Sequence, residues 1–230
     1  MFLLLALIYL IFISLGLPDS LFGAAWPVMH VDFNVNESFA SIYMIITAVG
    51  SGGVSFIAGP LIRKFGTGKV TVVSILLTAV GMLVIGFSVH IAMAICGSIL
   101  MGFGAGAIDT GLNNYVSTHY KVRHMNWLHA FWGVGVTLSP IIMGAFLDMN
   151  NNWRGGYRCV SCIQFAIFAA SLFSLPLFKK YEHSVTVETL DGAAPDESEE
   201  ENENTTKEQA EEDGEKPKKK KPAIFEILKI

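Results

Sequence analysis

Residues 91–116, IAMAICGSILMGFGAGAIDTGLNNYV, decide the fold of this 230-residue chain. The stretch is apolar for most of its length and long enough for a helix to cross the roughly 30 Å hydrocarbon core of a bilayer, which takes about 20 residues. One carboxylate, Asp109, lies well inside it. The stretch therefore predicts a transmembrane helix with a polar group at membrane depth.

Five further stretches of the same kind surround it, at residues 1–26, 38–62, 69–89, 126–147 and 159–178. The first has no basic segment before its apolar run and continues into residues 16–27, so we interpret it as a helix and not as a cleaved signal peptide. The sequence predicts an all-α membrane protein with a six-helix transmembrane bundle over residues 1–178. With 52% hydrophobic and only 16% charged residues, it has no basic stripe for a nucleic acid, and the lipid bilayer is its expected partner.

Basic residues in the short connections predict the orientation, because such connections tend to stay in the cytoplasm. The second-to-third connection carries Arg63, Lys64 and Lys69, and the fourth-to-fifth carries Lys121 and Arg123. The chain leaves the sixth span through two further lysines, whereas the first-to-second connection carries acids and no Lys or Arg. We therefore expect both termini on the cytoplasmic side of the plasma membrane.

The composition changes abruptly after residue 178: 9 basic and 15 acidic residues follow it, against 7 and 5 before it. Residues 179–221 contain too little apolar surface to offset the entropy lost on folding, so we predict a disordered, charged cytoplasmic linker. Residues 222–230 regain the pattern of an amphipathic helix. We expect this helix to lead into a second half that the sequence lacks.

Two acids within the spans are candidate proton-coupling residues, Asp109 and Asp19. An ionisable side chain in hydrocarbon is costly, so its presence points to function. Because desolvation opposes the charged form, such an acid can exchange a proton near neutral pH. The alternatives are a structural hydrogen bond for Asp109 and, for Asp19, a helix-capping role at a break near Pro18.

Amide, imidazole and indole side chains accompany the acids at helical spacing. Asn113 lies one turn after Asp109, while Asn126 and His129 share a face of the fifth span with Trp132 next to it. Amide and imidazole groups hydrogen-bond hydroxyls, and an aromatic ring packs against the apolar side of a sugar. These four residues, with both acids, are the candidate substrate-binding set; for His129 a hydrogen bond between helices is the alternative.

Other sequence features favour structural roles. Trp26 and Trp153 are typical of the aromatic belt at the membrane interface, and the glycine-rich segments at 50–53 and 97–106 indicate close helix packing. The Cys159–Cys162 pair is a weak metal motif without a second pair. Nothing in the sequence predicts a cofactor, a metal site or catalytic residues, so we expect no enzyme.

The connection after the second span resembles the loop motif of the major facilitator superfamily, G-x-L-x-D-R-x-G-R/K. Gly59, Leu61, Lys64 and Gly66 match in register, while Arg63 occupies the position that is acidic in the family. By this resemblance the five residues form the conformational loop motif. Because Arg63 stands in place of the family's acid, the motif lacks the carboxylate of its usual ion pair.

Within that superfamily, residues 1–178 are most similar to the fucose:proton symporter group. The similarity lies in the glycine-rich run that leads to Asp109 and Asn113 and in Asp19 on the first span. It also lies in residues 126–131, NWLHAF, which resemble the group's Asn-Leu-x-Gln/His-x-Phe pattern and contain Asn126 and His129. The resemblance implies proton-coupled uptake of a sugar by alternating access of two six-helix halves. The partners it implies are a small-molecule substrate, a proton, and a C-terminal half in the same chain or as a separate subunit.

Two alternatives remain open from the sequence. One is efflux of an amphipathic compound by a transporter of the same superfamily. The other, from a different class, is a non-transporting membrane anchor whose tail recruits a partner. The intramembrane Asp109 argues against the anchor, because an anchor gains nothing from a costly buried acid.

Overall fold

The computed structural model describes residues 2–176 and 178, which form six helices. They are α1 (Phe2–Asp32), α2 (Phe39–Phe65), α3 (Thr67–Gly86), α4 (Ile91–His119), α5 (Val122–Asp148) and α6 (Trp153–Phe173). All six are long and apolar enough to cross a membrane. The predicted all-α bundle is therefore confirmed. The predicted linker at 179–221 and helix start at 222–230 lie outside the described residues.

Several predicted helix ends were wrong. Prolines lie within α1, and the helix continues through both Pro18 and Pro27 to Asp32, so the expected break beside Asp19 is absent. α6 begins six residues before the predicted start, because the Asn152 side chain accepts from Gly155 N at 3.0 Å and caps the helix. The basic segment after α2 is not an open loop: Gly66 alone separates α2 from α3.

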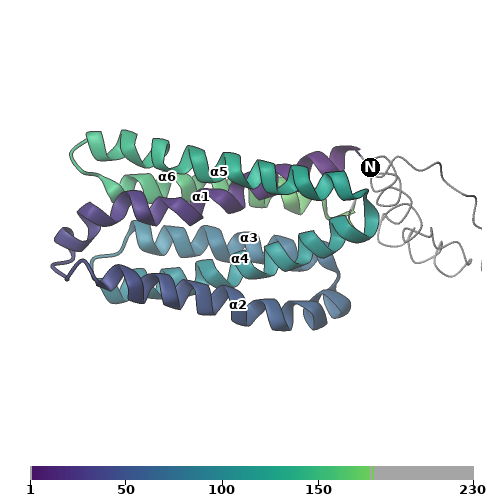
Figure 1. Cartoon of the computed structure of the whole chain (residues 1–230), viewed down its shortest axis with the longest axis horizontal. Coiled ribbons are helices and arrows are strands. Elements are labelled where there is room, and N and C mark those ends of the chain that lie inside the picture. The colour runs from purple at the N-terminus through teal and green to yellow at the C-terminus, as the bar shows by residue number, and fades with distance from the viewer. Residues whose placement is uncertain (1, 177, 179–230) are drawn as a thin grey trace, which may run out of the picture. The chain divides into compact units, whose positions relative to one another are not determined.

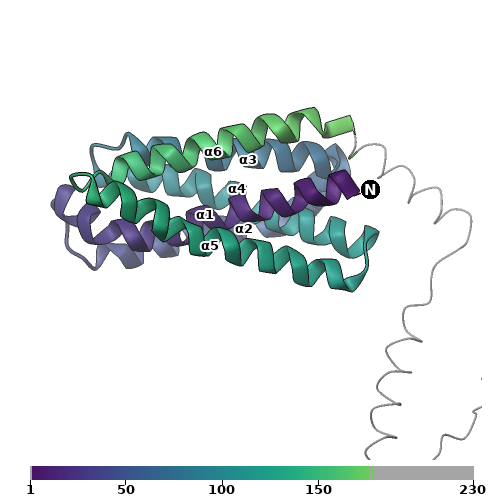
Figure 2. The ribbon, with the colours of Figure 1, turned by 90° about the horizontal axis from the view of Figure 1, so that it is seen from above.

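By their contacts the helices form an incomplete ring. Figures 1 and 2 show them side by side along the bundle, and in Figure 1 α1, α5 and α6 lie above α2, α3 and α4. α2 packs mainly on α4, α4 on α3, α3 on α6, and α1 mainly on α5 with a smaller contact to α6. The backbones of α1 and α5 approach those of α2 and α4 much less. The ring therefore has a seam between α1 and α5 on one side and α2 and α4 on the other.

Hydrogen bonds join α3 to α6 on the side of the ring opposite this seam. Ser161 Oγ donates to the carbonyl oxygen of Ala79, and Gln164 Nε2 donates to Thr78 Oγ1, both at 2.8 Å. All four residues are fully or almost fully buried. In hydrocarbon such polar contacts hold helices in a fixed register.

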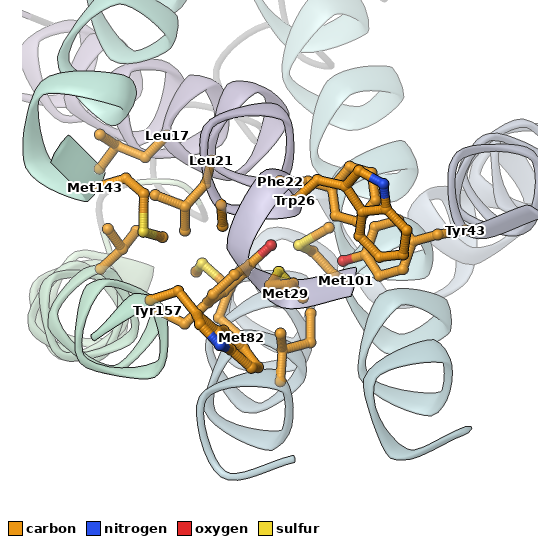
Figure 3. Close-up of a cluster of buried hydrophobic side chains, with 14 residues drawn as sticks. Leu17, Leu21, Phe22, Trp26, Met29, Tyr43, Met82, Met101, Met143 and Tyr157 are labelled. Atoms are coloured by element: carbon orange, nitrogen blue, oxygen red, sulfur yellow. The ribbon is translucent and has the colours of Figure 1, made fainter. Parts of the chain in front are cut away.

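Two apolar clusters close the seam, one toward each end of the bundle. Figure 3 shows the first cluster, in which the rings of Phe22 and Tyr43 stack at 3.9 Å between centroids and Met29 and Met101 lie nearby. The second cluster contains Phe12 and Leu15 of α1 with Ile108 and Leu112 of α4. Between the clusters, at the middle of the helices, the packing opens into a cavity.

Trp26 and Trp153 are not interfacial belt residues, contrary to expectation. They are 6% and 1% exposed within the first cluster. Trp26 Nε1 donates to the carbonyl oxygen of Glu37 at 3.0 Å, and Trp153 Nε1 donates to Asp32 Oδ2 at 3.0 Å. Each indole therefore has an internal partner, which is why both rings are buried.

Candidate substrate cavity

The central cavity has a volume of about 300 Å3 and lies across the seam. Four of its lining residues belong to the predicted site: Asp19, Asp109, His129 and Trp132. They come from α1, α4 and α5, so residues up to 113 positions apart meet at one place. The structure therefore brings together most of the candidate side chains that the sequence singled out.

Asp109 is held by its own helix. Asn113 Nδ2 donates to Asp109 Oδ1 at 2.9 Å, which is the one-turn contact expected from helical spacing. Ala105, one turn before Asp109, lines the cavity, while Gly106 packs against the carbonyl oxygen of Ser51 on α2. Asp109 thus presents its second oxygen on an accessible face of α4.

Asp19 is held by a different helix. Trp132 Nε1 on α5 donates to Asp19 Oδ2 on α1 at 2.8 Å. The Trp132 ring is 37% exposed. Each of the two cavity acids therefore has one oxygen that accepts a hydrogen bond and one that remains available to a ligand.

His129 lies edge-on to Phe12, with 6.3 Å between the ring centroids. Phe12 is 1% exposed, whereas His129 is exposed on the open side of α5. Asn126, one turn before His129, is exposed and is not among the residues that line the cavity. Asn113 does not line the cavity either, but it contacts Asp109, which does.

Sequence reasoning missed part of the lining. Phe12 and Leu15 precede Asp19 by seven and four residues, so helical spacing places them on its face and would have identified them. Ser51 of α2 carried no comparable signal, because it lies within the glycine-rich segment that we interpreted as packing.

The loop motif lies away from the cavity, at the end of α2. Gly66 has a φ of 84° and its N–H donates to the carbonyl oxygen of Ile62 at 2.8 Å, so it ends the helix in a backbone conformation that favours glycine. Arg63 and Lys64 belong to the last turn of α2, and Lys64 lies 5.3 Å from the centre of the Phe65 ring. Gly59 and Leu61 lie on the preceding turns of the same helix.

Comparison with known proteins agrees with this architecture. The family model described as Major Facilitator Superfamily matches residues 8–228. The chain belongs to this superfamily. The members that it resembles are membrane transporters and not enzymes.

Individual relatives are distant and differ in function. The chain is 22% identical over 190 residues to the glucose/mannose transporter GlcP of Bacillus subtilis (strain 168), a match that covers 81% of this chain and 47% of that protein. It is 25% identical over 152 residues to the multidrug efflux pump SdrM of Staphylococcus aureus (strain N315), covering 62% and 32%. A third match, 29% over 177 residues, is the Acurin A biosynthesis cluster MFS-type transporter of Aspergillus aculeatus, covering 72% and 31%. The chain thus spans about half the length of these relatives, or less.

Proposed function

We propose that this chain forms one half of a proton-coupled sugar transporter that works by alternating access. The observation that carries the proposal is the central cavity, which is lined by two carboxylates, an imidazole and an indole. Carboxylates accept hydrogen bonds from sugar hydroxyls, imidazole can donate or accept, and aromatic rings pack on the apolar face of a sugar ring. The resemblance to the glucose/mannose transporter of Bacillus subtilis supports the same substrate class.

In this proposal Asp109 binds the coupling proton. Asn113 on the same helix donates a hydrogen bond to one oxygen of Asp109, and the other oxygen is available to take the proton. Asp19, Asn113, Asn126, His129 and Trp132 help to bind the substrate. The resemblance to the fucose:proton symporter group supports the same assignment.

The proposed transporter requires a second six-helix half, either in the same chain or as a separate subunit. The most apolar part of α2 is only 11% buried and that of α5 only 17%, against 56% for α1 and 61% for α3. Between these two exposed helices lie the polar side chains of Asp19 and Asp109, which are unsuited to lipid contact. A second bundle on this face would enclose the cavity.

The test is sugar accumulation driven by a proton gradient, measured in proteoliposomes that contain the protein carrying this chain. We expect Asp109→Asn to abolish accumulation, because an amide cannot bind the coupling proton, while exchange of labelled for unlabelled sugar continues. Asp148→Asn is the matched control, because Asp148 is exposed at the end of α5, away from the cavity, and its loss should leave accumulation intact. Full coupled uptake by Asp109→Asn would sink the assignment.

Efflux of an amphipathic compound is the second candidate. Phe12, Leu15 and Trp132 give the cavity an aromatic and apolar wall, and one relative is named as a multidrug efflux pump. In the same proteoliposomes, competition by amphipathic compounds but not by sugars would favour efflux.

A further inference from the structure

The described part of the chain contains two hydrogen bonds from a tryptophan to an aspartate. Trp153 Nε1 donates to Asp32 Oδ2 at 3.0 Å, and Trp132 Nε1 donates to Asp19 Oδ2 at 2.8 Å. The donors and acceptors are chemically identical. Their surroundings differ in a way that assigns them different roles.

The pair between Trp153 and Asp32 is neutralised and fixed. Arg154 forms an ion pair with Asp32, donates through Nε to the carbonyl oxygen of Ser88 at 2.8 Å, and lies 4.3 Å from the centre of the Trp153 ring. Trp153 itself is 1% exposed. The guanidinium compensates the charge of Asp32, so this pair has a structural role.

The pair between Trp132 and Asp19 has no such cation. None of the eight residues that line the cavity is Lys or Arg, and the titratable groups beside Asp19 are Asp109 from α4 and His129 from α5. A hydrogen bond to a charged acceptor is roughly twice as strong as one to a neutral acceptor. A proton on Asp19 therefore weakens the bond from the indole, and a ligand hydroxyl that donates to Asp19 competes with it.

The backbones of α1 and α5 are in close contact at this level. A methyl group on Gly16 would collide with the carbonyl oxygen of Trp132, and one on Gly135 with the carbonyl oxygen of Ile13. Ser20 Oγ also donates to the carbonyl oxygen of Val136 at 2.6 Å. Because the two helices are held this closely, we expect a change at Asp19 to be taken up by the side chain of Trp132, a cavity-lining residue that is 37% exposed.

We propose that Trp132 is a positioning residue that responds to the state of Asp19. Its indole holds the Asp19 carboxylate while the cavity is empty, and it leaves that carboxylate when Asp19 takes a proton or a ligand hydroxyl. The freed ring then packs against the ligand. This inference rests on the proposed function, because it gives the cavity a ligand and a proton.

The test is the nitrogen-15 NMR signal of each indole N–H in the full chain, labelled at tryptophan and held in lipid nanodiscs. Trp132→Phe identifies the Trp132 signal. We expect Asp19→Asn to shift that signal and to speed exchange of its proton with water about tenfold, the factor that corresponds to the 1.4 kcal/mol lost when a charged acceptor becomes neutral. An unchanged Trp153 signal in the same sample verifies that the variant is folded.

Asp32→Asn is the matched control and should move the Trp153 signal only. The inference would be overturned if the Trp132 signal did not shift in Asp19→Asn, or if it shifted as much in Asp32→Asn. A normal Trp132 response without sugar uptake would instead retain this inference and contradict the proposed substrate.

Discussion

At the scale of single residues, Arg154 connects three parts of one end of the bundle. It pairs with Asp32 at the end of α1, donates to Ser88 between α3 and α4, and lies in the first turn of α6. Lysine retains the charge but cannot donate to both acceptors from a planar group. Replacement of Arg154 by lysine therefore keeps the positive charge but loses the simultaneous hydrogen bonds to Asp32 and Ser88.

We expect Arg154→Lys to lower the free energy of unfolding by about 0.5–1.5 kcal/mol, the range for one lost hydrogen bond, because the ion pair with Asp32 is partly exposed and adds little. Thermal unfolding in detergent measures the change. Arg63→Lys, at an exposed position in the last turn of α2, should unfold like the parent protein. Equal stability of the two variants would mean that the Arg154 contacts contribute nothing measurable.

Local residue contacts were predictable and distant ones were not. The hydrogen bond from Asn113 to Asp109 follows from the helical period. The bonds from Trp132 to Asp19 and from Trp153 to Asp32 join residues more than 110 positions apart, and nothing in the pattern of either helix specifies them. For the same reason the sequence could not distinguish a buried Trp153 from one at the membrane interface.

At the scale of helices, glycines determine how closely the elements approach. Gly16 and Gly135 face each other between α1 and α5, while a methyl group on Gly97 would lie 2.7 Å from the carbonyl oxygen of Gly81 on α3. The glycine-rich run of α4 therefore packs as predicted. Gly52 and Gly53, which we also expected to pack, have no atom of another described element within 4 Å of where a side chain would begin.

Gly135→Ala should destabilise the protein by about 1–3 kcal/mol, because the added methyl group forces α1 and α5 apart. Gly133→Ala, two residues away on the same helix, has open space at that position and should raise stability by up to about 1 kcal/mol through helix propensity. The melting temperatures of the two variants in detergent should thus move in opposite directions. A shift of the same sign in both would indicate that the helix contact is not tight.

The number and type of the helices were predictable because about 20 apolar residues are needed to cross a bilayer. The helix ends were less predictable, because they depend on contacts outside the apolar run. Asn152 caps α6 through its side chain, and Asp32 extends α1 to a point where it meets Arg154. Neither interaction can be predicted from the pattern of apolar residues.

At the scale of the whole molecule, the distribution of basic residues predicts which end of the bundle faces the cytoplasm. In a variant whose three cysteines are replaced by serine, a membrane-impermeant maleimide added to intact cells should label Glu37→Cys between α1 and α2. It should label Lys121→Cys, between α4 and α5, only after the membrane is permeabilised. The reverse pattern would invert the topology.

The incomplete ring has consequences for the mechanics of the bundle. Directional hydrogen bonds join α3 to α6, whereas two apolar clusters close the seam. Because apolar packing has no preferred direction, a small change of helix tilt breaks fewer directional contacts at the seam than at the α3–α6 interface. We therefore expect the bundle to deform more readily at the seam, which is where the cavity lies.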